Sequence, residues 1–565
     1  MLKNAVRLGV FSALSLLFNP VIAASLQIQE QADTVVATPS DWFLRDPETD
    51  KLQGVSADKT YNTLLKGKPS RTIVVAVIDS GVDIEHEDLK SVIWVNEDEI
   101  PGNGIDDDKN GYIDDVHGWN FIGGKDGNVD ADTYEVTREY KRLKDKYENF
   151  DEKKLNKKNR DEYAYWQRVK TKYERDFKFN KEQYDQYAEQ LNIYTNAFLT
   201  IKYCDSILTK KLGAPVSKSS LASIESTNDT INFAKQTLTR ILESIEGDIE
   251  VNEFVDELGY YLDQLQEGVD HYRVAVEYGY SLDFDSRSIV GDNPDDPYEK
   301  GYGNNDVKGP DARHGTHVAG IIAADRNNDL GIRGIADNVR IMSVRAVPNG
   351  DERDKDVANA IIYAVDNGAH IINMSFGKSF SPQKEAVDKA VKYAESKGVL
   401  MIHAAGNDGR DLDKEENFPT RKYLKSGQAT AWVEVGASSW GAEQDFVASF
   451  SNYGKRSVDV FAPGVQIYST VPDNGYENLQ GTSMASPATA GVAAIIMSYF
   501  PELTASQVSD ILKKSTRKFD GLKVNKPGSG DEVPFNQLST SGGLVNAYEA
   551  VKLAAEVSSS SLKKK

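Results

Sequence analysis

Three short stretches of this 565-residue chain carry side chains that could act together in nucleophilic catalysis. "VIDSGVD" contains Asp79, "DARHGTHVAGII" contains His314, and "GTSMASPATAG" contains Ser483. A serine hydroxyl becomes an effective nucleophile when a neutral imidazole accepts its proton and a fixed carboxylate stabilises the imidazolium that forms. The three stretches together therefore indicate acyl transfer, although each one alone is a weak signal.

His314 and His317 stand three residues apart, so on a helix they would share one face and could bind a metal ion. A zinc site of this kind needs a His-Glu-x-x-His helix or cysteine and aspartate ligands nearby. Gly315 and Thr316 lie between the two histidines, and the chain has seven histidines and one cysteine in all. The pattern therefore favours a general base over a metal ligand.

The sequence around these residues predicts buried strands that alternate with helices. Continuous apolar runs occupy 71–79, 339–347, 369–376, 398–406 and 431–438, and helical patterns occupy 355–366, 384–397 and 484–499. This alternation predicts an α/β fold with a doubly wound, mostly parallel sheet. Functional sites in such sheets lie beyond the carboxyl ends of the strands, where Asp79, Ser375 and Asn407 are found.

The blocks "VIDSGVD", "HGTHVAGII", "NMSFG", "AAGND" and "GTSMASP" resemble those of the subtilisin family of serine proteases, in the family's order. The resemblance covers about 41–130 and 297–556. It implies that Ser483 is the nucleophile, that His314 is the general base and then acid, and that Asp79 orients it. It also implies that Asn407 and the backbone N–H of Ser483 form the oxyanion hole, and it leaves His317 as a packed helix residue.

The same resemblance implies a polypeptide substrate and the residues that hold it. One wall of the groove matches Ser375, Phe376 and Gly377, and the opposite wall of the primary pocket matches Ala404, Ala405 and Gly406. A peptide would pair with the first wall as an added strand. The acidic segment 349–356 matches a second wall of the groove, where it would favour basic substrates; the alternative is that its acids belong to a solvated surface loop.

Residues 131–296 depart from the family pattern, which separates the aspartate and histidine by only a few tens of residues. The segment is rich in Tyr, Lys, Glu and Gln, with near-heptad spacing from Tyr184 to Leu208. We predict an antiparallel helical insertion with an aromatic core, in which Cys204 is a buried apolar residue. It could act as a lid, or it could bind a partner. An alternative function is therefore partner binding by the insertion on a catalytically silent protease scaffold.

The loop "NGIDDDKNGYIDDVHGWNF" (103–121) resembles the first half of an EF-hand-type calcium loop. Its candidate ligands are Asp106, Asp108, Asn110, the carbonyl of Tyr112, Asp114 and Asp115. His117 stands where a full EF-hand has its closing glutamate. We predict a structural calcium site of incomplete EF-hand type.

The N-terminal sequence predicts that the protein leaves the cytoplasm. Residues 1–23 combine Lys3, Arg7, an apolar stretch and a small-residue end at Ala23, which predicts a signal peptide followed by a linker at 24–40. No later stretch is apolar enough to span a membrane, and the net charge of −21 argues against nucleic acid as a partner. We expect an exported protein, periplasmic or secreted, with a disordered tail at 557–565.

Overall fold

The computed structural model describes residues 38–562 except 244 and 246. The predicted signal peptide and most of the predicted linker lie outside the described residues. The described chain divides into two compact units, a protease unit formed by 38–170 and 281–562, and a helical unit formed by Thr171–Tyr280.

The protease unit is built on a nine-stranded sheet in the order β10-β13-β7-β6-β5-β4-β1-β3-β2. Neighbouring strands run parallel, except that β10 is antiparallel to β13. In chain order the strands are β1 (Ile73–Asp79), β2 (Gly118–Asn120), β3 (Val339–Arg345), β4 (Ile371–Met374), β5 (Leu400–Ala404), β6 (Trp432–Ser438), β7 (Val460–Pro463), β10 (Arg517–Lys518) and β13 (Gly543–Leu544). The predicted doubly wound, mostly parallel sheet is confirmed.

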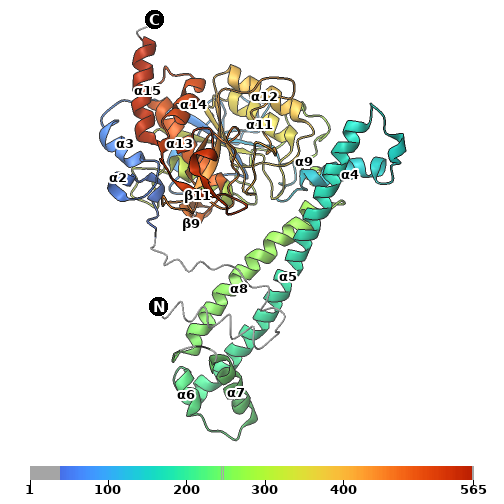
Figure 1. Cartoon of the computed structure of the whole chain (residues 1–565), viewed down its shortest axis with the longest axis vertical. Helices are drawn as coiled ribbons and strands as arrows, with labels where there is room; N and C mark the ends of the chain where they lie inside the picture. Colours follow the sequence, from blue (N-terminus) through green and yellow to red (C-terminus); the bar gives the residue numbers. More distant parts are fainter. Residues whose placement is uncertain (1–37, 244, 246, 563–565) are drawn as a thin grey trace. The chain divides into compact units, whose positions relative to one another are not determined.

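Helices pack against both faces of this sheet. Alternate residues of β1 enter different cores: Val75 and Val77 pack in the first, and Ala76 and Ile78 in the second. The first core includes α10 (Arg313–Ala323), α13 (Thr482–Tyr499), α14 (Ala505–Lys514) and α15 (Ala547–Leu562). The second includes α11 (Asp354–Asp366) and α12 (Lys384–Ser396). This alternation is the two-residue period of a strand buried on both faces. Figure 1 shows α14 and α15 on the left of the protease unit and α11 and α12 on its right.

Shorter elements complete the protease unit. They are the 3₁₀ helices η2 (Trp42–Leu44), η3 (Lys90–Val92), η4 (Glu152–Lys154) and η6 (Phe535–Gln537), the helices α2 (Pro47–Asp50), α3 (Ala57–Thr63), α4 (Glu135–Tyr147) and α9 (Arg287–Val290), and the hairpins β8–β9 (Ile467–Val471, Gly475–Leu479) and β11–β12 (Lys523–Asn525, Glu532–Pro534). Among the described residues, no helix has the length and apolar character needed to cross a bilayer.

The helical unit contains most of α5 (Arg160–Leu212), together with α6 (Lys218–Ala222), α7 (Asp229–Glu243), α8 (Val251–Val274) and the π-helical turn η5 (Ala275–Gly279). Its core joins α5 to α7 and α8 through buried apolar residues that include Ile201, Cys204, Leu238 and Phe254. Burial raises the pKa of the Cys204 thiol, consistent with the predicted packing role. The ends of the unit meet where Tyr173 Oη donates to the carbonyl of Tyr280 at 3.0 Å.

The helical unit is shorter than the predicted insertion (131–296), because both ends of that segment pack into the protease unit. The ring of Trp166 stacks on Tyr140 of α4 with centroids 5.2 Å apart, and Tyr165 meets Phe380 edge-on at 5.6 Å. The start of α5 thus packs in an aromatic core of the protease unit. The heptad spacing runs through the whole helix and therefore could not show that its first turns belong to a different unit.

The tail also differs from the prediction. We expect disorder from residue 557, but α15 continues to Leu562. Val551 and Ala554 of this helix are buried in the first core, and helix formation continues from that packed turn into the serine-rich segment.

Candidate active site

Asp79 and His314 form the best-defined pair of the candidate site. Asp79 is the last residue of β1 and is 1% exposed, while His314 lies in the first turn of α10. Asp79 Oδ1 lies 2.7 Å from His314 Nδ1 and also accepts a hydrogen bond from the backbone N–H of Ser80 at 2.8 Å. Burial by itself lowers the pKa of His314, but the Asp79 carboxylate outweighs it and raises that pKa above its ordinary value of 6.5.

Ser483 lies in the first turn of α13, beside the strand end that carries Ser375. Ser483 Oγ donates to the carbonyl of Ser375 at 3.1 Å, and Ser375 Oγ donates back to the carbonyl of Ser483 at 2.9 Å. In this conformation the acceptor of the Ser483 hydroxyl is Ser375 rather than His314. The helices that carry the serine and histidine nevertheless pack together in one core, which includes Val318 of α10 and Met484 of α13.

Asn407 is held by its side-chain oxygen beside the start of α13. Its Oδ1 accepts from both the N–H and the Oγ1 of Thr482, each at 2.9 Å. A Cβ added to Gly481 would lie 3.3 Å from Asn407 Nδ2 and 3.5 Å from the backbone N of Ser483. Both nitrogen atoms therefore lie beside the same point next to Gly481, which adopts a φ of 155° that only glycine readily takes.

His317 is buried and donates from the side of α10 that faces the β8–β9 hairpin. Its Nε2 lies 2.9 Å from the carbonyl of Ile467 and 3.1 Å from that of Glu477. Burial lowers the pKa of His317 to about 4, so the ring is neutral at physiological pH. These contacts agree with a packed helix residue.

The residues predicted to bind substrate lie at the carboxyl ends of two neighbouring strands. Ser375, Phe376 and Gly377 follow β4, whereas Ala404 ends β5 and is followed by Ala405 and Gly406. Gly377 is exposed, and the N–H of Gly406 donates to Thr482 Oγ1 at 3.0 Å. The structure therefore places both predicted walls at the carboxyl ends of β4 and β5, on the same side of the sheet as Asn407 and the start of α13.

One buried histidine behind these walls was missed by sequence reasoning. His403 of β5 contacts the carbonyl of Phe376 through Nε2 and Glu434 Oε1 through Nδ1, both at 2.8 Å. The sequence did carry a signal for this pair: a histidine and a glutamate stand in neighbouring buried strands ("LMIHA" and "WVEV"), and buried charged groups require partners.

The expected acidic groove wall at 349–356 is wrong. Glu352, Asp354 and Asp356 are buried, and the structure supplies each of the last two with an internal cation. Asp354 lies 2.9 Å from Lys378 Nζ, and Asp356 lies 2.7 Å from the guanidinium of Arg287. Since sequence alone does not show which distant bases pair with these acids, their charge was wrongly assigned to the surface.

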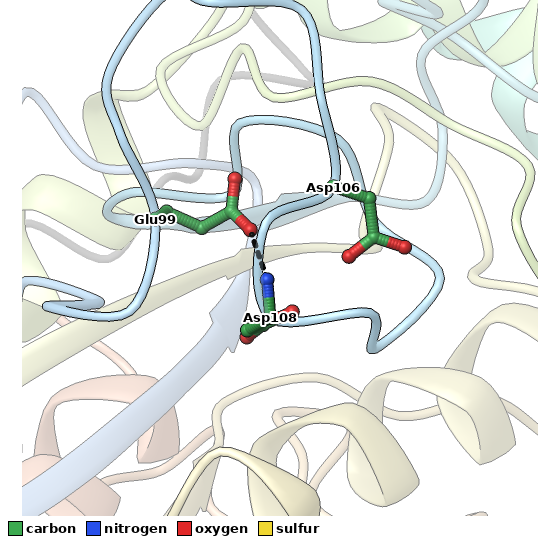
Figure 2. A group of neighbouring side chains, drawn as sticks. All are labelled: Glu99, Asp106 and Asp108. Atoms are coloured by element: carbon green, nitrogen blue, oxygen red, sulfur yellow. Dashed lines mark hydrogen bonds between the residues drawn. The ribbon is translucent and has the colours of Figure 1, made fainter.

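The predicted calcium loop separates into two groups of side chains. Carboxylate oxygens of Glu99, Asp106 and Asp108 lie within 4.8 Å of one another. Figure 2 shows these three side chains in the loop. Glu99 is missing from the predicted ligands because it lies outside the D-x-D-x-N-G pattern. Three hard oxygen donors at this spacing fit a Ca²⁺ ion.

The other predicted ligands lie outside this cluster and, like the clustered carboxylates, make hydrogen bonds within the loop or to neighbouring segments. Asp114 accepts from the N–H groups of Asn103 and Gly104, and Asp115 accepts from Tyr363 Oη at 2.6 Å. Burial raises the pKa of Asp115 to about 6. Asn110 donates through Nδ2 to Asp108 and Asp115, both at 3.0 Å, and Tyr112 is buried, its ring 4.9 Å from that of Tyr363.

Comparison with known proteins places the chain in a family. The strand-end Asp79 pairs with His314 of α10, and α10 packs against α13, the helix whose first turn carries Ser483; a serine hydrolase of this kind needs these three residue types. The sequence model of the subtilase family matches residues 70–530, and the chain belongs to this family of subtilisin-like serine endopeptidases.

Two curated relatives show how far the similarity extends. The thermophilic serine proteinase of Bacillus sp. (strain AK1) is 46% identical over 33% of this chain and 42% of its own length. Thermitase of Thermoactinomyces vulgaris is 37% identical over 42% of this chain and 75% of its own. Among solved structures, a cold-adapted subtilisin-like serine proteinase is 30% identical, covering 43% of this chain and 78% of that one, with a TM-score of 0.34.

Proposed function

We propose that this protein is an active serine endopeptidase that hydrolyses peptide bonds through an acyl-enzyme on Ser483. The observation that carries the proposal is the 2.7 Å contact between His314 Nδ1 and the buried carboxylate of Asp79. With Nδ1 held in this way, Nε2 of the neutral ring is left to accept the proton of the serine hydroxyl.

The reaction then proceeds in two transfers. Ser483 Oγ attacks the scissile carbonyl while His314 takes its proton, and the imidazolium returns that proton to the leaving amine. A water molecule, deprotonated by His314, then hydrolyses the ester and frees Ser483. In this proposal the Ser483 hydroxyl leaves the carbonyl of Ser375 and turns towards His314 by rotation about its Cα–Cβ bond.

Asn407 Nδ2 and the N–H of Ser483 are proposed to stabilise the oxyanion. The fixed Oδ1 of Asn407 supports this role, because an amide anchored at its oxygen presents its nitrogen in one direction. Asn407→Ala should lower kcat by about 10²–10³, a figure established on another member of this family.

Labelling with a serine-directed fluorophosphonate tests the proposal. Wild-type protein should label on Ser483, and Ser483→Ala should neither label nor cleave a mixed peptide library while keeping its melting temperature. A folded wild type that does not label would instead favour the alternative, partner binding by the helical unit on a silent scaffold.

We also propose a structural calcium ion held by the clustered carboxylates of Glu99, Asp106 and Asp108. The remaining ligands predicted from the sequence, Asn110, the carbonyl of Tyr112, Asp114 and Asp115, are not part of this cluster. The ion would supply positive charge to a chain of net charge −21 and cross-link its loop. Isothermal titration with Ca²⁺ tests it directly, since binding that Asp108→Asn does not weaken would place the ion elsewhere.

Export is proposed from the N-terminal pattern at 1–23, with the protein acting on polypeptides in the periplasm or outside the cell. Fractionation of cells expressing the full chain, with Edman sequencing of the mature N-terminus, tests both the compartment and the predicted end of the signal peptide at Ala23.

A further inference from the structure

His403 joins the segment that follows β4 to two buried side chains of β6. Its Nε2 lies 2.8 Å from the carbonyl oxygen of Phe376, and its Nδ1 lies 2.8 Å from Glu434 Oε1. A carbonyl oxygen can only accept, so Nε2 carries a proton and donates it to Phe376. Glu434 is held in turn by Trp432, whose Nε1 donates to the second carboxylate oxygen at 2.9 Å. With both of its nitrogens engaged, the buried ring has one orientation.

The surroundings of this pair are apolar, and packing alone does not call for a histidine and a glutamate there. His403 is 0% exposed and Glu434 is 6% exposed. Two ionisable groups taken out of water carry a desolvation penalty that apolar side chains of similar volume avoid. The one contact that the pair makes with the predicted substrate walls is the hydrogen bond to the Phe376 carbonyl. We therefore look for its role at that carbonyl.

The bond to the Phe376 carbonyl sets the direction of the next N–H group. This carbonyl and the N–H of Gly377 belong to one trans peptide, in which the two groups point in opposite directions. On the other side of Gly377, the backbone of Lys378 exchanges hydrogen bonds of 2.8 and 3.0 Å with that of Phe418. Gly377 thus lies between two anchored residues and is itself exposed. Its N–H faces away from His403, towards the place that an added strand would take.

We propose that His403 is a positioning residue, which through the Phe376 carbonyl aims the Gly377 N–H at the third substrate residue before the scissile bond. The inference rests on the proposed endopeptidase function and deepens it. The carbonyl of Ser375 lies 3.1 Å from Ser483 Oγ, so Ser375 faces the substrate residue at the scissile bond. Gly377 is two residues further along, and side-by-side strands keep a two-residue period. A substrate of one residue ends before Gly377, whereas one of three residues reaches it.

Two replacements of His403 separate positioning from packing. In His403→Asn the amide nitrogen takes about the place of Nδ1, so Glu434 keeps a donor and the Phe376 carbonyl loses one. In His403→Gln the amide nitrogen takes about the place of Nε2 and keeps the bond to Phe376. The substrates are acetyl-Ala p-nitroanilide and acetyl-Ala-Ala-Ala p-nitroanilide.

His403→Asn should lower kcat/KM for the three-residue substrate by about three- to tenfold, the worth of one hydrogen bond, and leave the one-residue substrate within about twofold. His403→Gln should keep both values within about twofold of the wild type. Ser509→Ala is the matched control, because it removes another buried hydrogen bond to this part of the sheet, from Ser509 Oγ to the carbonyl of Trp432 at 2.9 Å. It should leave the ratio of the two substrates unchanged.

An equal fall for both substrates in His403→Asn overturns the proposal, as does a fall in His403→Gln that matches it. If His403→Asn does not fold, Trp432→Phe decides the question. It frees one oxygen of Glu434 and should lower kcat/KM by about threefold for the three-residue substrate alone, so an unchanged ratio there also overturns the proposal. A folded wild type that neither labels with the fluorophosphonate nor cleaves either substrate would instead refute the proposed function itself.

Discussion

Gly315 stands against the backbone of Gly81, so that a methyl group at residue 315 would overlap the Gly81 carbonyl oxygen and lie 3.2 Å from Cβ of Asp79. Helix α10 therefore approaches the end of β1 more closely than any residue with a side chain permits. This close approach explains a glycine inside a helix, where glycine costs about 1 kcal/mol relative to alanine. It also sets the position of the neighbouring His314 relative to Asp79.

Gly315→Ala should reduce kcat/KM by at least about 10²-fold, because pushing α10 away from β1 by about 1 Å misplaces the general base. Activity on a peptide substrate and thermal melting of the same preparation measure the two effects. Gly441→Ala is the control, since a Cβ there meets no atom within 4 Å. Equal activity of the two variants would show that the close approach does not position the histidine.

The acid side of the pH profile should reflect the raised pKa of His314. The base must be neutral, so kcat/KM should fall as pH decreases through a value above 6.5. Asp79→Asn removes the charge that raises this pKa, and its residual activity should therefore titrate at lower pH than that of the wild type. A wild-type midpoint well below 6.5, or a midpoint that Asp79→Asn leaves unmoved, would contradict the assignment.

Chelation by EDTA should lower the melting temperature, because an ion bound only by the folded state stabilises that state. Glu99→Gln should remove this response by taking one carboxylate from the cluster. Asp115→Ala should lower the melting temperature both with and without calcium, since Asp115 accepts from Tyr363, Asn96 and Asn110. Asp126→Ala, at an exposed acid, is the control. A full EDTA response in Glu99→Gln would exclude Glu99 as a ligand.

Lys378→Met should destabilise the protein by about 3–5 kcal/mol, the usual cost of breaking a buried ion pair. Lys378 Nζ lies 2.7 Å from Glu135 of α4 and 2.9 Å from Asp354, and the side chain is 1% exposed. Lys425→Met, at a lysine 83% exposed, should change stability by less than about 1 kcal/mol. Urea unfolding midpoints compare them, and similar values for the two would mean that water reaches the buried cluster.

Local patterns predicted the elements of the fold well and the contacts between them poorly. The apolar runs 71–79 and 398–406 predicted parallel strands, and β1 and β5 lie within them, each buried on both faces. Glu99 was missed because it approaches Asp106 and Asp108 only in three dimensions. Asp354 was misassigned to the surface for the same reason, since its partner Lys378 lies in another segment.

The contact between Tyr173 and Tyr280 shortens the loop that the chain must close to bring Asp79 and His314 together. Asp79 and His314 are 235 positions apart, but the contact at the ends of the helical unit spans 107 of them. Once that unit has folded, the loop to be closed behaves as one of about 130 residues, and because the entropy of loop closure grows only with the logarithm of length, its free-energy cost falls by about 0.5 kcal/mol. A subtilase chain can therefore carry a helical unit of this size between two residues of one site with little penalty to their assembly.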